Sequence, residues 1–166
     1  MYKTINDFLG DWEKESTATC KVLSKITDDS LGTKVYPEGR TLGFLAWHVV
    51  TTIGEMLSKT GLKVLCPDEN SVEPSHAAEI YQNYKISSDS LTNEIKNNWS
   101  DKSLDEEVEM YGESWKKGFV LKTLVNHQIH HRGQITMLMR HAGLDVPGVY
   151  GPSREDWQKM GMEPMK

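Results

Sequence analysis

The chain has 166 residues, of which 37% are hydrophobic and 26% are charged. This length suits one globular domain, which buries about 70% of its unfolded surface and needs neither a disulfide nor a metal merely to fold. The 24 Asp and Glu residues outnumber the 19 Lys and Arg residues, so the net charge is −5. Because the basic residues are dispersed, the sequence offers no basic stripe for nucleic acid or for an anionic membrane surface.

The N-terminal stretch carries acidic residues and lacks the basic and apolar regions of a secretory signal, so we expect no such signal. No apolar run approaches the roughly 18 residues of a membrane span. Cys20 and Cys66 lie far apart without a CxxC motif, which favours free thiols in a reducing compartment, although two cysteines can in principle pair. We therefore expect a cytoplasmic protein.

Apolar residues recur at three- and four-residue steps in four parts of the chain, which predicts four amphipathic helices. Thr4 followed by Asp7 is typical of a capping box at the start of the first helix. Gly61 and Gly143 predict left-handed ends for the second and fourth helices. The predicted helices span about residues 4–27, 41–60, 75–99 and 119–142.

Two long connections separate these helices. Residues 62–74 are polar and contain two prolines, which is typical of a connector. Residues 100–118 show a weak alternation of apolar residues, but Gly112 and many charges oppose a strand. We therefore predict an ordered crossover loop there.

Four helices of about 20 residues, each with one apolar stripe, favour an antiparallel bundle. The sequence therefore predicts an all-α fold, a four-helix bundle in a single domain over residues 1–166. In the tail, residues 143–166, several prolines and glycines prevent continued helix, while Ser153 followed by Asp156 predicts one short capped helical turn. We expect this tail to pack over an end of the bundle.

Three histidines interrupt the apolar stripes. His127 and His131 are four residues apart, which on a helix means about 40° of rotation and about 6 Å of rise, so both imidazoles can reach one ion. His48 lies on the inward stripe of the second helix. The pattern predicts three inward-facing histidines on two facing helices.

Two interpretations of these histidines remain open. Each can be a core histidine with its own hydrogen-bond partner, or all three can share one divalent cation. A buried imidazole without a partner costs on the order of 1–3 kcal/mol, whereas one cation satisfies all three. Three neutral ligands leave a coordination position open for water or a thiolate, as in catalytic sites. Zinc or nickel is the expected metal, since tris-imidazole sites accept several ions.

Two familiar metal motifs are excluded. The helix reads HQIHH and lacks the glutamate of a zincin, and no carboxylate has the spacing of a facial triad. Glu55, seven residues after His48, and Gln134, three residues after His131, are candidates to orient a ligand or bound water, or simply boundary residues. His130 faces about 100° away from His131 and is not expected to join the same ion.

Three stretches of the sequence resemble one family. They are LAWHVV around His48, NHQIHHRGQI at residues 126–135, and AGLDVPGVYGPSREDW near the end of the chain. Together they resemble the DinB/YfiT-like metal-binding four-helix bundles. The resemblance implies that His48, His127 and His131 are the metal ligands. It also implies an up-down-down-up bundle, with a long connection between its second and third helices, and a homodimer.

The resemblance further implies a reaction. Characterised relatives resemble metal-dependent thiol transferases and isomerases that use bacillithiol, mycothiol or glutathione. The first hypothesis is therefore a metal-dependent S-transferase whose partners are a small-molecule thiol and an electrophile. The second is a metal-dependent hydrolase in which the bound water attacks an ester or amide. The third is a non-catalytic metal-binding or ligand-binding protein of the stress response.

Overall fold

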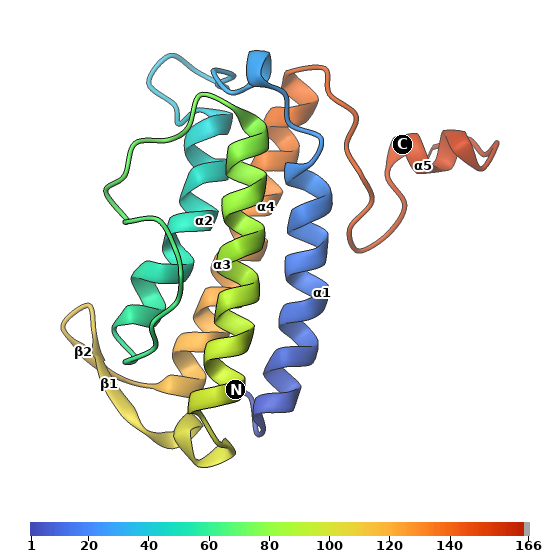
Figure 1. Ribbon diagram of the computed structural model, residues 1–166. Helices are drawn as coiled ribbons and strands as arrows, with labels where there is room; N and C mark the ends of the chain where they lie inside the picture. Colours follow the sequence, from blue (N-terminus) through green and yellow to red (C-terminus); the bar gives the residue numbers. More distant parts are fainter. Residues whose placement is uncertain (165–166) are drawn as a thin grey trace.

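The protein consists mainly of four long helices that lie side by side, as a computed structural model of residues 1–164 shows (Figure 1). They are α1 (Ile5–Leu23), α2 (Leu42–Ser58), α3 (Ala77–Asn98) and α4 (Lys117–His141). The four predicted helices are confirmed, with ends within about one turn of those expected. None of the helices in residues 1–164 combines the length and apolar character of a transmembrane span.

The helices are not packed in chain order. α1 and α2 each pack against α3 and α4. α1 and α4 run toward one end of the molecule, while α2 and α3 run toward the other (Figure 1). The connection between α2 and α3 therefore returns along the length of the helices (Figure 1). This order places α2 directly beside α4, the two helices that carry the predicted histidine ligands.

Local sequence signals explain where the helices begin and end. Thr4 Oγ1 accepts from the backbone amide of Asp7 at 3.1 Å, and the Asp7 carboxylate accepts from the Thr4 amide at 3.0 Å, so the predicted capping box is confirmed. Gly61 and Gly143 follow α2 and α4 with φ of 85° and 75°. Only glycine adopts this left-handed conformation at little cost, and both predicted stops are confirmed.

The core lies between the four helices and is largely apolar. Phe8 and Trp12 of α1 stack with ring centroids 6.0 Å apart. The Trp12 indole N–H donates to Ser88 Oγ of α3 at 3.0 Å, which satisfies the ring's one polar atom inside the core. α1 is thereby fixed against α3 by packing and by a buried hydrogen bond.

The expectation of a purely helical fold is wrong in one segment. After the short 3₁₀ helix η2 (Asp101–Asp105), the strands β1 (Glu107–Met110) and β2 (Glu113–Lys116) form an antiparallel hairpin where we expected a loop. Tyr111 and Gly112 form its two-residue turn with φ of 55° and 83°, as a type I′ turn requires. The turn reverses the chain, and the fully buried Met110 anchors the hairpin.

The tail packs on the bundle as expected, with Val146 buried, but it does not lie over an end. The loop after α4 runs beside the helices, where the Tyr150 hydroxyl contacts the Glu15 carboxylate of α1, and does not cover an end of the bundle. The capped short helix is present as α5 (Arg154–Lys159), but it extends away from the four helices (Figure 1). None of its residues is buried, and it is tied to α4 by the Glu155 carboxylate, which accepts from the Arg140 guanidinium at 2.7 Å. Residues 165–166 of the predicted tail lie outside the described residues.

Candidate metal centre

The structure brings together all three predicted histidines. His48 comes from α2, and His127 and His131 come from successive turns of α4. The Nε2 atom of His127 lies 3.2 Å from that of His48 and 3.1 Å from that of His131. Nitrogen ligands at about 2.0–2.1 Å from a tetrahedral zinc lie about 3.3–3.4 Å apart. The three imidazoles therefore fit one metal ion.

Hydrogen bonding alone does not satisfy this cluster. A neutral imidazole carries one ring hydrogen, so His127 Nε2 offers either one hydrogen or one lone pair. It therefore satisfies only one of its two contacts, with His48 or with His131. Its other nitrogen, Nδ1, is buried without a hydrogen-bond partner among residues 1–164. The three Nε2 atoms are placed so that their lone pairs could share one cation.

Burial keeps these imidazoles neutral. It lowers the pKa of His48 and of His127 to about 4, and it also lowers the pKa of His131. The neighbouring imidazoles and the Arg40 guanidinium add to the effect, since a positive charge nearby disfavours another. A neutral imidazole is the form that binds a metal, so the cluster is in its metal-binding form at neutral pH.

Gln134 orients one of the three imidazoles. Its Oε1 accepts a hydrogen bond from Nδ1 of His131 at 2.7 Å, which leaves the Nε2 lone pair directed at the cluster. The Gln134 amide nitrogen lies 3.2 Å from Nε2 of His130, which accepts its hydrogen. Gln134 thus lies beside His131, as its sequence spacing predicted, and His130 is held outside the cluster.

Glu55 is not near the histidines. Its carboxylate accepts from the Tyr111 hydroxyl at 2.9 Å, at the turn of the β-hairpin. The periodicity placed it on the same helix face as His48, but two turns of helix separate the two residues. His76 is also remote, since its Nδ1 lies 2.9 Å from the Asp28 carboxylate at the start of α3.

Sequence reasoning missed two buried polar residues of α4. Gln128 is fully buried, and its side chain donates to the Val49 carbonyl at 2.8 Å, which fixes α4 against α2 next to two of the histidines. The Arg132 guanidinium donates to the Glu15 carboxylate at 2.6 Å and to the Tyr150 hydroxyl at 2.7 Å. A charged residue between His131 and a glycine gave no signal of burial.

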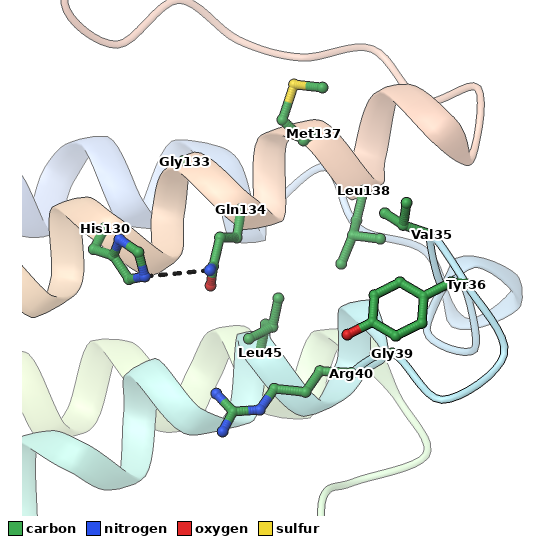
Figure 2. Close-up of a pocket in the computed structure, with 10 residues that line it drawn as sticks. All are labelled: Val35, Tyr36, Gly39, Arg40, Leu45, His130, Gly133, Gln134, Met137 and Leu138. Carbon is green, nitrogen blue, oxygen red and sulfur yellow. Dashed lines mark hydrogen bonds between the residues drawn. The ribbon is translucent and has the colours of Figure 1, made fainter.

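Two hollows flank the histidine cluster. The larger, of about 450 Å³, lies between α4 and the segment 35–45, and both His130 and Gln134 line it (Figure 2). The smaller, of about 120 Å³, is lined by His48 itself together with Trp47 and the acidic Glu73. A small molecule in the larger hollow would therefore lie beside the side chain that orients His131.

Comparison with known proteins places this chain in a family. The model of the DinB family matches residues 1–165. The uncharacterized protein YrdA of Bacillus subtilis (strain 168) is 42% identical over 166 residues, which cover 100% of this chain and 99% of that protein. Its name assigns it no activity.

Solved structures agree in fold. A DinB-like protein from Bacillus cereus ATCC 10987 matches with a TM-score of 0.88 and 42% identity, covering 90% of this chain and 100% of the other. YjoA, a DinB-like protein from Bacillus subtilis, matches with a TM-score of 0.67 and 17% identity over 86% of this chain and 96% of its own, which shows the fold alone. With a family match over nearly its whole length and relatives at 42% identity, the chain belongs to the DinB family.

Proposed function

We propose that His48, His127 and His131 hold one divalent cation, zinc or nickel, and that this metal site is catalytic. The observation that carries this proposal is the convergence of three Nε2 atoms, two of them within 3.2 Å of the third. The fold does not need the ion for stability, because a large apolar core already lies between the helices. The ion is therefore assigned to function.

The protein's own residues prepare the site. Burial holds His48 and His127 neutral, and Gln134 holds the His131 ring with its Nε2 lone pair toward the cluster. When bound, a cation on three neutral imidazoles supplies Lewis-acid chemistry, which lowers the pKa of a thiol or water at its open position. The three histidines add no negative charge that would weaken this effect.

We propose that the reaction is transfer of a low-molecular-weight thiol, such as bacillithiol, to an electrophile. The thiol loses its proton to solvent, its sulfur forms a bond to the electrophilic carbon, and the leaving group departs with the electron pair of the broken bond. Membership of the DinB family and the 450 Å³ hollow beside Gln134 support this assignment. The hollow is large enough for a small organic substrate.

The proposal extends to topology and environment. The helix directions in Figure 1 and the packing of α1 and α2 on α3 and α4 support an up-down-down-up four-helix bundle. The free thiols of Cys20 and Cys66 support a reducing, cytoplasmic environment. The homodimer implied by the family resemblance stays a prediction.

Elemental analysis tests the metal site first. Purified protein should contain about one zinc or nickel per chain, His127→Ala should lose it, and His141→Ala, an exposed histidine on the same helix, should retain it. Retention of the metal by His127→Ala would contradict the site. The measured stoichiometry also identifies the ion.

A kinetic assay then tests the reaction. Metal-loaded protein with bacillithiol and 1-chloro-2,4-dinitrobenzene should form the thioether faster than His127→Ala does. Equal rates would remove the transferase proposal. Turnover of esters or amides without any thiol would instead support a hydrolase. A metal that raises the melting temperature, with no turnover across a thiol and substrate panel, would support a binding protein.

A further inference from the structure

The larger hollow beside the histidines has two kinds of wall. α4 supplies one side, and the segment before α2, together with its first turn, supplies the other (Figure 2). Most of the lining is apolar, because Leu45, Leu138, Met137 and Val35 face it along with the ring of Tyr36. Such a lining favours an organic body over a hydrated ion.

Arg40 is the one Arg or Lys residue among those that line this hollow. Figure 2 shows its side chain reaching along α2 toward the end where His130 and Gln134 lie. Within residues 1–164 it makes no ion pair, and its guanidinium carbon lies 5.1 Å from the centre of the Phe44 ring. The chain thus presents an arginine without a carboxylate partner at the edge of an apolar hollow, although acidic residues outnumber basic ones.

The start of α2 does not supply a second anion site. The amides of Leu42 and Gly43 donate to the carbonyls of Thr33 and Leu31, each at 2.9 Å. The amide of Phe44 donates to the capping hydroxyl of Thr41 at 2.9 Å. Since the first amides of the helix are already paired, recognition of an anion in this hollow falls to the Arg40 side chain.

We propose that this hollow binds a small organic carboxylate, whose anionic group pairs with Arg40 and whose apolar body lies against Leu45 and Leu138. The assignment rests on the proposed function, because it names the class of electrophile that the transferase would accept. The occupant is the electrophile and not the thiol, since low-molecular-weight thiols such as bacillithiol are polar over most of their surface. The guanidinium is suited to this role because it matches a carboxylate with two parallel N–H donors.

A matched pair of probes isolates the charge. 4-Phenylbutyrate and 4-phenylbutan-1-ol share an apolar body and differ in the carboxylate. Calorimetric titration of metal-free protein should show the carboxylate binding about tenfold or more tightly than the alcohol. Arg40→Gln should abolish the preference, and Arg40→Lys should retain part of it. Arg154→Gln removes the same charge from exposed α5 and should change nothing.

A second variant locates the probe. Gly133 lines the hollow, and a Cβ added there meets nothing within 4 Å, so Gly133→Leu is designed to fill part of the hollow. It should abolish binding of both probes and leave the circular dichroism spectrum unchanged. If binding of both probes persists in Gly133→Leu, they bind elsewhere and the proposal is overturned.

The outcomes separate this inference from the proposed function. Equal affinity of wild-type protein for the two probes, or an equal loss of preference in Arg40→Gln and Arg154→Gln, overturns the carboxylate site. Neither result bears on metal content, which elemental analysis measures independently. Conversely, loss of the metal site would leave a carboxylate preference in metal-free protein intact and remove only its assignment as a substrate site.

Discussion

Nδ1 of His131 donates a hydrogen bond to Oε1 of Gln134 at 2.7 Å, three residues further along α4. This bond fixes the tautomer and the ring orientation of His131, one of the three proposed metal ligands, and leaves its Nε2 free. Gln134→Leu should therefore reduce metal affinity by about 10- to 100-fold. Competition with a chromophoric chelator measures the change. Gln134→Glu retains an acceptor and serves as the matched control, and equal losses in the two variants would contradict the role of the hydrogen bond.

Glu55 should have no such effect. Its carboxylate accepts from the Tyr111 hydroxyl of the hairpin turn and contacts no histidine in residues 1–164. Glu55→Gln is therefore expected to change metal affinity by less than about twofold, as for a surface substitution. The same chelator competition measures it. A tenfold loss would show that Glu55 acts on the cluster through contacts absent from the structure.

The metal-free protein should lose stability as the pH falls from about 6.5 to about 4. Burial lowers the pKa of His48 and His127 to about 4, so across this window the unfolded chain binds protons that the folded chain excludes. Their contribution to stability is complete above the unfolded pKa and is lost as the pH falls toward the folded value. Urea denaturation at a series of pH values measures this slope.

Two variants separate the contributions to that slope. His127→Gln removes one of the depressed groups and should flatten the slope. His76 has the opposite sign, because the Asp28 carboxylate raises its pKa, so its contribution is present at low pH and is lost as the pH rises through the folded value. His76→Asn should therefore leave the slope between pH 6.5 and 4 unchanged, and should remove a loss of stability that the wild-type protein shows as the pH rises above about 6.5. An unchanged slope in His127→Gln would show that the cluster does not exclude protons.

Arg132→Ala should destabilise the protein by about 3–5 kcal/mol, because it leaves a partly buried carboxylate without its partner. The side chains of Arg132 and Glu15 are only 3% and 14% exposed. Arg140 is 36% exposed and its partner Glu155 is 16% exposed, so solvent screens this pair more than the Arg132 pair, and Arg140→Ala should cost less, about 1–3 kcal/mol. Thermal or urea denaturation compares the two variants, and similar losses would contradict a structural role for the Arg132 pair.

Sequence periodicity predicted the helices because four separate apolar stripes have no other way to be buried. It also placed His48, His127 and His131 on inward faces, since each interrupts such a stripe. The hairpin was not predicted because its turn places Tyr111, as well as Gly112, at positive φ. A tyrosine rarely adopts that conformation, so its presence in the sequence does not indicate such a turn. Its strands also carry three glutamates on their exposed positions, which masks their alternation.

The remaining errors have a common origin. The burial of Arg132 depends on Glu15 and Tyr150, which approach it from distant parts of the chain, and a single helix pattern contains no trace of either. The position of the tail is set by the same contacts. Likewise, the helical spacing of Glu55 from His48 gave its face but not its partner, which is supplied by the unpredicted hairpin.

The histidine cluster joins the first third of the chain to its last third. Only α2 and α4 hold the imidazoles, and the connection 59–76 and the whole of α3 lie between them in sequence. A bound ion would therefore link the fragment that contains α2 to the fragment that contains α4. A chain cut in the connection between α2 and α3 would be expected to reassemble more tightly with the ion than without it, which turns a proposed catalytic centre into a reporter of fragment complementation.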